Sequence, residues 1–249
     1  MKPNIIFDFN GVLLWDSHIH QKVWEEYTLK LRKTPLTHEE LLEHFEGRSV
    51  KACLEYILKR KLTDTELKQL TAAREKRYRK LVKAMKDNFS LSPGAVALLD
   101  TLVTHNIPHT IATSAGKTNM RFFFEHLHLD KWFDFDSIVY DDGSLPSKPA
   151  PDIYQKAAKK LNADPKDCLV IEDAHSGVQA ALSAGIGTVI ALGSQTRLKE
   201  FPKVSYTIDS LGEMVPLVRK YRVTKKSKFI QNAYISSLQT NTIPSKISI

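Results

Sequence analysis

The sequence has few cysteines, no long apolar segment and no recognisable leader. Its only two cysteines, Cys53 and Cys168, lie far apart and form no metal-like spacing, which argues against a disulfide framework and favours reduced thiols. No run approaches the ~18 consecutive apolar residues of a membrane span. The first residues, Met1–Asn4, lack the architecture of a signal peptide. We therefore expect a cytoplasmic protein with no membrane span.

Acidic residues are absent from the end of the chain. The 249 residues carry a formal net charge of +8, yet no Asp or Glu follows Glu213, where seven Lys and Arg side chains occur. The rest of the chain is close to neutral, so it offers no general attraction for polyanions. Nucleic acid or an anionic surface is expected as a partner, if at all, only of the basic tail 223–249. A solvated, inert tail is the simpler alternative. We expect a monomer.

The apolar segment Ile5–Leu14 is the first clear structural signal. It reads as a strand buried on both faces, as in the centre of a parallel sheet. Asp8 would then stand at the carboxyl end of this strand, where open α/β sheets bind ligands. The segment that follows, Trp15–His18, predicts a helix N-cap.

The remaining chain divides into two patterns. Residues 18–88 have helical spacing without a convincing strand, whereas alternating strands and helices after Ser92 indicate a parallel sheet. We predict an α/β core formed by 1–15 and 89–222, a helical cap at 16–88 and a flexible tail at 223–249. The core strands are expected at 109–112, 136–140, 168–171, 188–191 and 205–208, with helices at 94–105, 117–127, 151–161, 176–184 and 211–221.

Polar side chains collect where these strands end. Each has an ordinary explanation as a cap, turn or solvated residue, but together they occupy one face of one sheet. A nucleophilic carboxylate, hydroxyl and lysine groups for an anion, and further carboxylates for a hard cation suit Mg²⁺-assisted phosphoryl transfer. The set consists of Asp8, Asn10, Thr113, Ser114, Lys148, Glu172 and Asp173.

Four motifs in this set resemble the haloacid dehalogenase superfamily, in the branch of β-phosphoglucomutase-like phosphatases. The motifs are Asp8–Val12, Thr113–Ser114, Ser147–Pro151 and Glu172–Gly177, and they occur in the order and spacing of that family. The helical insertion lies where that branch carries its cap. The resemblance implies a Rossmann-like parallel-sheet core and a Mg²⁺-dependent phosphatase of small phosphorylated metabolites.

The resemblance also implies roles for individual residues. Asp8 would be the nucleophile that forms an aspartyl-phosphate. Mg²⁺ would be held by Asp8, the backbone carbonyl of Asn10 and the Asp173 carboxylate. Glu172 would support the metal ligands, and Lys148 would balance the negative charge.

Further residues are expected to contact the substrate. By the resemblance, Thr113 and the backbone that follows it, at Ser114 and Ala115, would donate to phosphate oxygens. Arg48 lies in a segment that matches the cap loop of the family, although a solvated surface arginine is the alternative. His20 matches a position beside the active site, although a structural histidine is equally compatible with its helical setting.

One departure from the family pattern bears on activity. Members of this branch carry an aspartate two residues after the nucleophile, where it exchanges protons with the leaving group and water. This chain has Asn10, an amide with no proton to exchange. A phosphatase in which His20 or a cap residue replaces the acid, a non-catalytic relative that binds a phosphorylated ligand or a protein, and an enzyme of altered chemistry all remain open. The phosphatase hypothesis predicts that Asn10→Asp speeds turnover of alkyl phosphates.

Overall fold

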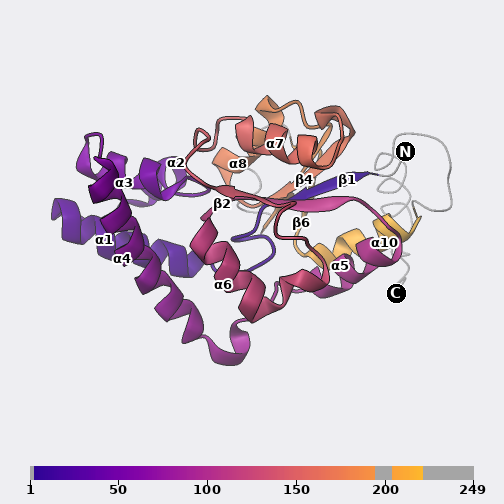
Figure 1. Cartoon of the computed structure of the whole chain (residues 1–249), viewed down its shortest axis with the longest axis horizontal. Helices are drawn as coiled ribbons and strands as arrows, with labels where there is room; N and C mark the ends of the chain where they lie inside the picture. Colours follow the sequence, from indigo (N-terminus) through magenta and orange to yellow (C-terminus); the bar gives the residue numbers. More distant parts are fainter. Residues whose placement is uncertain (1–2, 194–203, 221–249) are drawn as a thin grey trace, which may run out of the picture.

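The computed structural model describes residues 3–193 and 204–220, and a six-stranded parallel sheet forms its centre (Figure 1). The strand order is β3-β2-β1-β4-β5-β6, and every neighbouring pair runs parallel. This arrangement confirms the predicted α/β class with a Rossmann-like core. The strands are β1 (Asn4–Phe7), β2 (His109–Gly116), β3 (Val139–Asp141), β4 (Cys168–Glu172), β5 (Thr188–Leu192) and β6 (Tyr206–Ile208).

Successive side chains of β1 pack on opposite faces of the sheet, because side chains alternate along a β-strand. Ile5 and Phe7 belong to one buried apolar cluster, whereas Ile6 belongs to a second cluster on the other face of the sheet. All three side chains are fully buried. The continuous apolar run of the first strand is therefore explained by burial on both faces.

Helices cover both faces of the sheet. Buried residues of α5 (Ala95–Thr104), α6 (Lys117–Leu127) and α10 (Met214–Lys220) share the cluster of Phe7. Those of α7 (Asp152–Lys160) and α8 (His175–Ser183) share the cluster of Ile6, and Figure 1 shows these two helices together on the opposite side of the sheet.

Four helices form the block between β1 and the rest of the core. They are α1 (Ser17–Arg32), α2 (His38–His44), α3 (Val50–Leu58) and α4 (Asp64–Lys83), and they lie together at the left of Figure 1. Thr37 and Thr63 each close a capping box at the start of a helix. The block contains no strand among its described residues, which confirms the predicted helical cap insertion. The domain boundaries near residues 15 and 89 stay predictions.

Two strand predictions need correction. The segment 136–140 was expected to be a strand, but β3 covers only Val139–Asp141. Asp134 accounts for the difference, because its side chain and carbonyl bind the backbone N–H groups of Asp136 and Ser137 in a turn. The strand predicted at 109–112 continues to Gly116, so Thr113 lies within β2 rather than after it.

Several predictions concern parts or properties that this fold does not test. The basic tail 223–249 lies outside the described residues. Among the helices that the structure describes, none combines the length and apolarity needed to cross a bilayer. The monomeric state and cytoplasmic location stay predictions.

Candidate active site

The site lies where the strand order changes direction. β1 is flanked by β2 on one side and by β4 on the other, so the connections leave the sheet in opposite senses at this point. Such a switch opens a crevice at the carboxyl ends of the central strands. Asp8, Thr113 and Glu172 come from three neighbouring strands and meet there.

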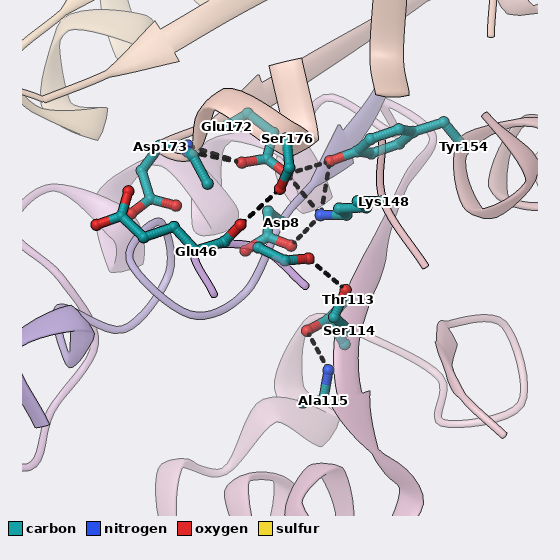
Figure 2. Close-up of polar contacts among 12 residues, drawn as sticks. Asp8, Glu46, Thr113, Ser114, Ala115, Lys148, Tyr154, Glu172, Asp173 and Ser176 are labelled. Atoms are coloured by element: carbon teal, nitrogen blue, oxygen red, sulfur yellow. Dashed lines mark hydrogen bonds and ion pairs between the residues drawn. The ribbon is translucent and has the colours of Figure 1, made fainter. Parts of the chain in front are cut away.

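Lys148 is the centre of a buried polar cluster. Figure 2 shows its ammonium group between two carboxylates, with Nζ 2.7 Å from Asp8 Oδ1 and 2.5 Å from Glu172 Oε1. Nζ also lies 3.1 Å from the Tyr154 hydroxyl. Lys148 is 1% exposed and Glu172 is fully buried, so the cation and the anions neutralise each other away from water.

Glu172 is held by four donors. The Tyr154 hydroxyl donates to Oε1 at 2.6 Å beside Lys148, and the backbone N–H groups of Asp173 and Ala174 donate to Oε2 at 2.9 and 3.0 Å. These four contacts fix both carboxylate oxygens of Glu172. Tyr154 was not foreseen from the sequence, because a tyrosine one turn into a helix has no distinguishing local signal.

Burial shifts the pKa values of Asp8 and Lys148. Burial raises the pKa of Asp8 to about 7, and Lys148 offsets only part of that effect. Burial alone would lower the pKa of Lys148, but the carboxylates of Asp8 and Glu172 raise it above its ordinary value. Additional positive charge would therefore stabilise Asp8 as a carboxylate.

The chemistry of the donor set fits a hard divalent cation. Asp8, Glu172 and Asp173 each offer a carboxylate oxygen, these oxygens lie within 4.8 Å of one another, and all three residues are buried. Ser17 Oγ donates to Asp173 Oδ2 at 3.3 Å and orients that side chain. Oxygen ligands of this kind suit Mg²⁺.

Most of the predicted site residues surround one cavity of about 100 Å³. Lys148 and Glu172 do not line it; both lie behind Asp8. A second cavity of about 760 Å³ adjoins it between α3, α4 and the core, and the two share Ser114 and Asn119 among their walls. The predicted residues that line the first cavity are Asp8, Asn10, His20, Arg48, Thr113, Ser114, Ala115 and Asp173.

Asp16 is more than the helix N-cap that the sequence predicted. It precedes α1, but its side chain makes no capping bond to that helix. The fully buried carboxylate instead accepts hydrogen bonds from Asn10 Nδ2 at 2.7 Å, from the Gly11 N–H at 3.2 Å and from the Tyr78 hydroxyl. The Asp16 oxygens therefore bind Asn10 and Tyr78, a residue of the helical cap domain, in place of the backbone N–H groups at the start of α1.

The nitrogens of His20 face protein groups. Nδ1 lies 2.7 Å from Arg74 Nη2, Nε2 lies 3.2 Å from Asp16 Oδ2, and the ring stacks on Tyr78. Since an arginine only donates, Nδ1 is the acceptor and Nε2 carries the hydrogen. Nε2 is buried and has no hydrogen-bond partner among the described residues, although it lies close to the Asp16 carboxylate. The role of His20 as a replacement acid stays a prediction.

Arg48 borders the cavity with a partly unsatisfied guanidinium group. Its Nη2 donates to the carbonyl of Glu43 at 2.9 Å, while the buried Nε has no hydrogen-bond partner among the described residues. Burial lowers the pKa of Arg48. The remaining donors could serve an anionic ligand.

Three serines of the core hold the loop between α2 and α3. They contact this loop, residues 45–49, from β2 (Ser114), from α8 (Ser176) and from the segment between β3 and α7 (Ser147). The cap is thus fastened over the cavity by short hydrogen bonds to its backbone. The bonds run from Ser114 Oγ to Gly47 O at 2.7 Å, from Ser176 Oγ to Glu46 O at 2.6 Å and from Ser49 N to Ser147 Oγ at 2.8 Å.

In the segment of β2 that is predicted to bind phosphate, two polar groups already have partners within the protein. The Ala115 N–H donates to Thr113 Oγ1 at 3.1 Å, and Ser114 Oγ is directed to the cap loop. The hydroxyl of Ser114 thus holds the cap, whereas Thr113 borders the cavity with its 1% exposed side chain.

Comparison with known proteins supports this arrangement. The sequence profile of the haloacid dehalogenase-like hydrolases matches residues 3–185. A haloacid dehalogenase hydrolase of subfamily IA, variant 3, from Entamoeba histolytica is 37% identical, with a TM-score of 0.73, covering 87% of this chain and 99% of that one. A Bacillus subtilis β-phosphoglucomutase is 30% identical over 190 residues, which are 74% of this chain and 81% of that protein.

The chain spans less than half of some longer relatives. It is 35% identical over 146 residues to an Arabidopsis thaliana bifunctional riboflavin kinase/FMN phosphatase, a match that covers 58% of this chain but only 36% of that protein. The matched profile nevertheless covers well over half of this chain and includes β1, β2, β4 and the helical cap. The chain belongs to the haloacid dehalogenase-like hydrolase family.

Proposed function

We propose that this protein is a Mg²⁺-dependent phosphatase that hydrolyses a small phosphorylated metabolite through an aspartyl-phosphate on Asp8. The observation that carries the proposal is the buried cluster of Asp8, Lys148, Glu172 and Asp173 beside the cavity. A carboxylate nucleophile, a fixed cation and a second carboxylate within reach of one ion are the requirements of this chemistry.

In the first half of the reaction, a carboxylate oxygen of Asp8 forms a bond to phosphorus while the bond to the leaving oxygen breaks. Lys148 holds Asp8 in place through Oδ1 and compensates the charge that gathers on the carboxylate and the phosphoryl oxygens. Mg²⁺, bound by Asp8, Asp173 and the Asn10 carbonyl with Glu172 in support, would supply the additional positive charge. Thr113 would donate its hydroxyl to a phosphoryl oxygen.

In the second half, water attacks phosphorus, the Asp8 carboxylate departs and inorganic phosphate is released. Asn10 cannot take the proton of that water or protonate a leaving alkoxide. A positioned acid–base contributes about 10²–10⁴-fold, so turnover should be slowed but not abolished. Leaving groups that need no protonation should be hydrolysed best.

The two cavities indicate where a substrate would lie. The phosphoryl group would occupy the 100 Å³ cavity beside Asp8, and the remainder of the substrate would occupy the adjoining 760 Å³ cavity. The names of the relatives, an FMN phosphatase and a β-phosphoglucomutase, are consistent with a small phosphorylated metabolite.

Asn10 favours a second candidate function. A protein that binds a phosphorylated ligand without turning it over would keep the cation site and the fixed lysine but would not need an acid–base. An enzyme of altered chemistry on the same ligand is the third possibility. These alternatives predict Mg²⁺-dependent thermal stabilisation by ligand without release of inorganic phosphate.

Metal removal tests the proposed function. We expect the protein to release phosphate from p-nitrophenyl phosphate with Mg²⁺, to lose this activity in EDTA and to regain it when Mg²⁺ is restored. The reason is that buried Asp8 needs more positive charge than Lys148 provides. A panel of phosphorylated metabolites assayed for free phosphate then identifies the substrate. Phosphate release that persists in EDTA, or none with any substrate, contradicts the proposal.

Closure of the cap loop yields a further prediction. A Cβ at Gly47 would lie 2.4 Å from Ser176 Oγ, and Gly47 has a φ of +71°. We expect Gly47→Ala to keep the 45–49 loop from seating on the core and to lower kcat/KM on the order of 10²-fold, because the cap then misplaces the substrate. Steady-state kinetics with p-nitrophenyl phosphate measure the effect.

Gly185→Ala is the matched control for this substitution. Gly185 has a φ of +77°, a Cβ there meets nothing within 4 Å, and this residue lines neither cavity. Both variants carry similar backbone strain, so their difference isolates the collision with Ser176. Equal kcat/KM values in the two variants would show that the loop need not seat closely for catalysis.

A further inference from the structure

Asp16 determines which way the side-chain amide of Asn10 faces. An ionised carboxylate only accepts hydrogen bonds, so the group of Asn10 at 2.7 Å from Asp16 Oδ2 must be its NH₂. The Tyr78 hydroxyl, 3.4 Å from Asn10 Nδ2, lies on the same side. A flipped amide would set two oxygens against each other in a buried place.

The opposite end of the amide is consequently available to the cavity. Asn10 lines the cavity beside Asp8, and its Oδ1 has no hydrogen-bond partner among residues 3–193 and 204–220. Asp16 itself is fully buried and does not line the cavity. The carboxylate therefore acts on the cavity only through Asn10.

We infer that Asp16 is a positioning residue for the proposed phosphatase reaction. It holds Asn10 so that Oδ1 accepts a hydrogen bond from the attacking water and directs a lone pair of that water toward phosphorus. The proton lost by the water passes to solvent, since the amide cannot take it. This inference rests on the proposed function and adds a residue that lies behind the site.

The pairing predicts that Asn10→Asp alone gives less than the full gain in activity from restoring an acid at position 10. In Asn10→Asp a second carboxylate would lie at hydrogen-bonding distance from Asp16, with no amide between them. Two buried like charges disfavour each other. The exchanged pair, Asn10→Asp with Asp16→Asn, keeps one carboxylate and one amide, and the amide at position 16 can still accept from the Gly11 N–H.

The test is a double-mutant cycle on the full chain with four proteins: the wild type, Asn10→Asp, Asp16→Asn and the exchanged pair. We expect Asp16→Asn to lower kcat for p-nitrophenyl phosphate on the order of 10²-fold with little change in KM, because the Asn10 amide is no longer oriented. We expect the exchanged pair to hydrolyse an alkyl phosphate about 10²–10⁴-fold faster than the wild type. Asn10→Asp alone should fall clearly short of that gain.

Stability is the second readout of the cycle and needs no substrate. Each single variant should lower the urea midpoint, and the exchanged pair should recover most of the loss, since only the pair restores a carboxylate facing an amide. Asp130→Asn, at an exposed aspartate, is the matched control and should change neither readout.

The outcomes separate this inference from the proposed function. If the wild type releases phosphate but Asp16→Asn behaves like Asp130→Asn, the positioning role is wrong and the proposed function stands. If the urea midpoints are additive, positions 10 and 16 are not coupled and the inference is overturned. Phosphate release by none of the four proteins contradicts the proposed function itself.

Discussion

Asp8→Asn is expected to abolish phosphate release and, when metal is chelated, to make the folded protein more stable above neutral pH. The loss of activity follows because an amide is a poor nucleophile and cannot form the aspartyl-phosphate. Removal of the nucleophile of another covalent hydrolase costs on the order of 10⁶-fold. Single-turnover assays of phosphate release with p-nitrophenyl phosphate and Mg²⁺ would measure the loss.

The gain in stability follows from the pKa of Asp8. Burial raises this pKa from 3.8 to about 7, so the folded state binds a proton that the unfolded chain has already lost between these pH values. The contribution of Asp8 to stability is thus most favourable below pH 4 and is lost as the pH rises through about 7. The amide carries no such cost, although its bond to Lys148 is weaker than that of the carboxylate.

Urea unfolding in EDTA at pH 4, 6 and 8 tests this effect. The advantage of Asp8→Asn over the wild type should grow with pH, to at most about 4 kcal/mol. Asp130→Asn, an exposed aspartate, should show no such trend. An advantage that is constant across pH, or largest at pH 4, would mean that Asp8 is not a buried carboxyl whose charge the fold disfavours.

Lys148→Met is expected to damage both stability and activity. The substitution leaves Asp8 and Glu172 as buried carboxylates without their shared cation, and breaking a buried ion pair in this way costs about 3–5 kcal/mol. Activity should fall on the order of 10²–10³-fold, the cost of losing one donor that stabilises developing charge. Urea unfolding at pH 8 and phosphate release with Mg²⁺ are the measurements.

Lys156→Met is the matched control for this prediction. Lys156 forms a surface ion pair with Asp142 at 3.3 Å and should change stability by less than about 1 kcal/mol. Combining Lys148→Met with Asp8→Asn should also be less destabilising than Lys148→Met alone, since one of the stranded carboxylates is gone. A Lys148→Met protein as stable as Lys156→Met would contradict the view that Lys148 neutralises the site.

Local sequence patterns carried the prediction of the sheet and of the helical insertion. The segment Ile5–Phe7 has the apolar continuity of a strand buried on both faces, and it is the central strand of the sheet. Thr37 and Thr63 begin helices through the capping boxes that their spacing predicts. The prediction of a strand at 136–140 was wrong, because a turn that starts at Asp134 includes residues 136–138 and β3 begins only at Val139.

The site residues also fall into two groups: those that sequence motifs predicted and those that only the structure revealed. Asp8, Lys148 and Asp173 were predicted as site residues because each belongs to a short sequence motif, and the structure brings Lys148 within 2.7 Å of Asp8. Tyr154 and Tyr78 could not be predicted, since their roles arise from contacts with residues 18 and 62 positions away. Such contacts leave no pattern in the neighbouring sequence.

Asp16 shows the difference between what local sequence motifs determine and what only the folded chain decides. The order and spacing of the motifs determined the fold class, the family resemblance and the set of candidate carboxylates, since these depend on which residue types follow which strands. The partner of a buried carboxylate is decided only when the chain is folded, because hydrogen bonds at 2.7 Å depend on packing between helices and loops far apart in sequence. The tertiary structure alone therefore turned an expected helix cap into the residue that orients Asn10.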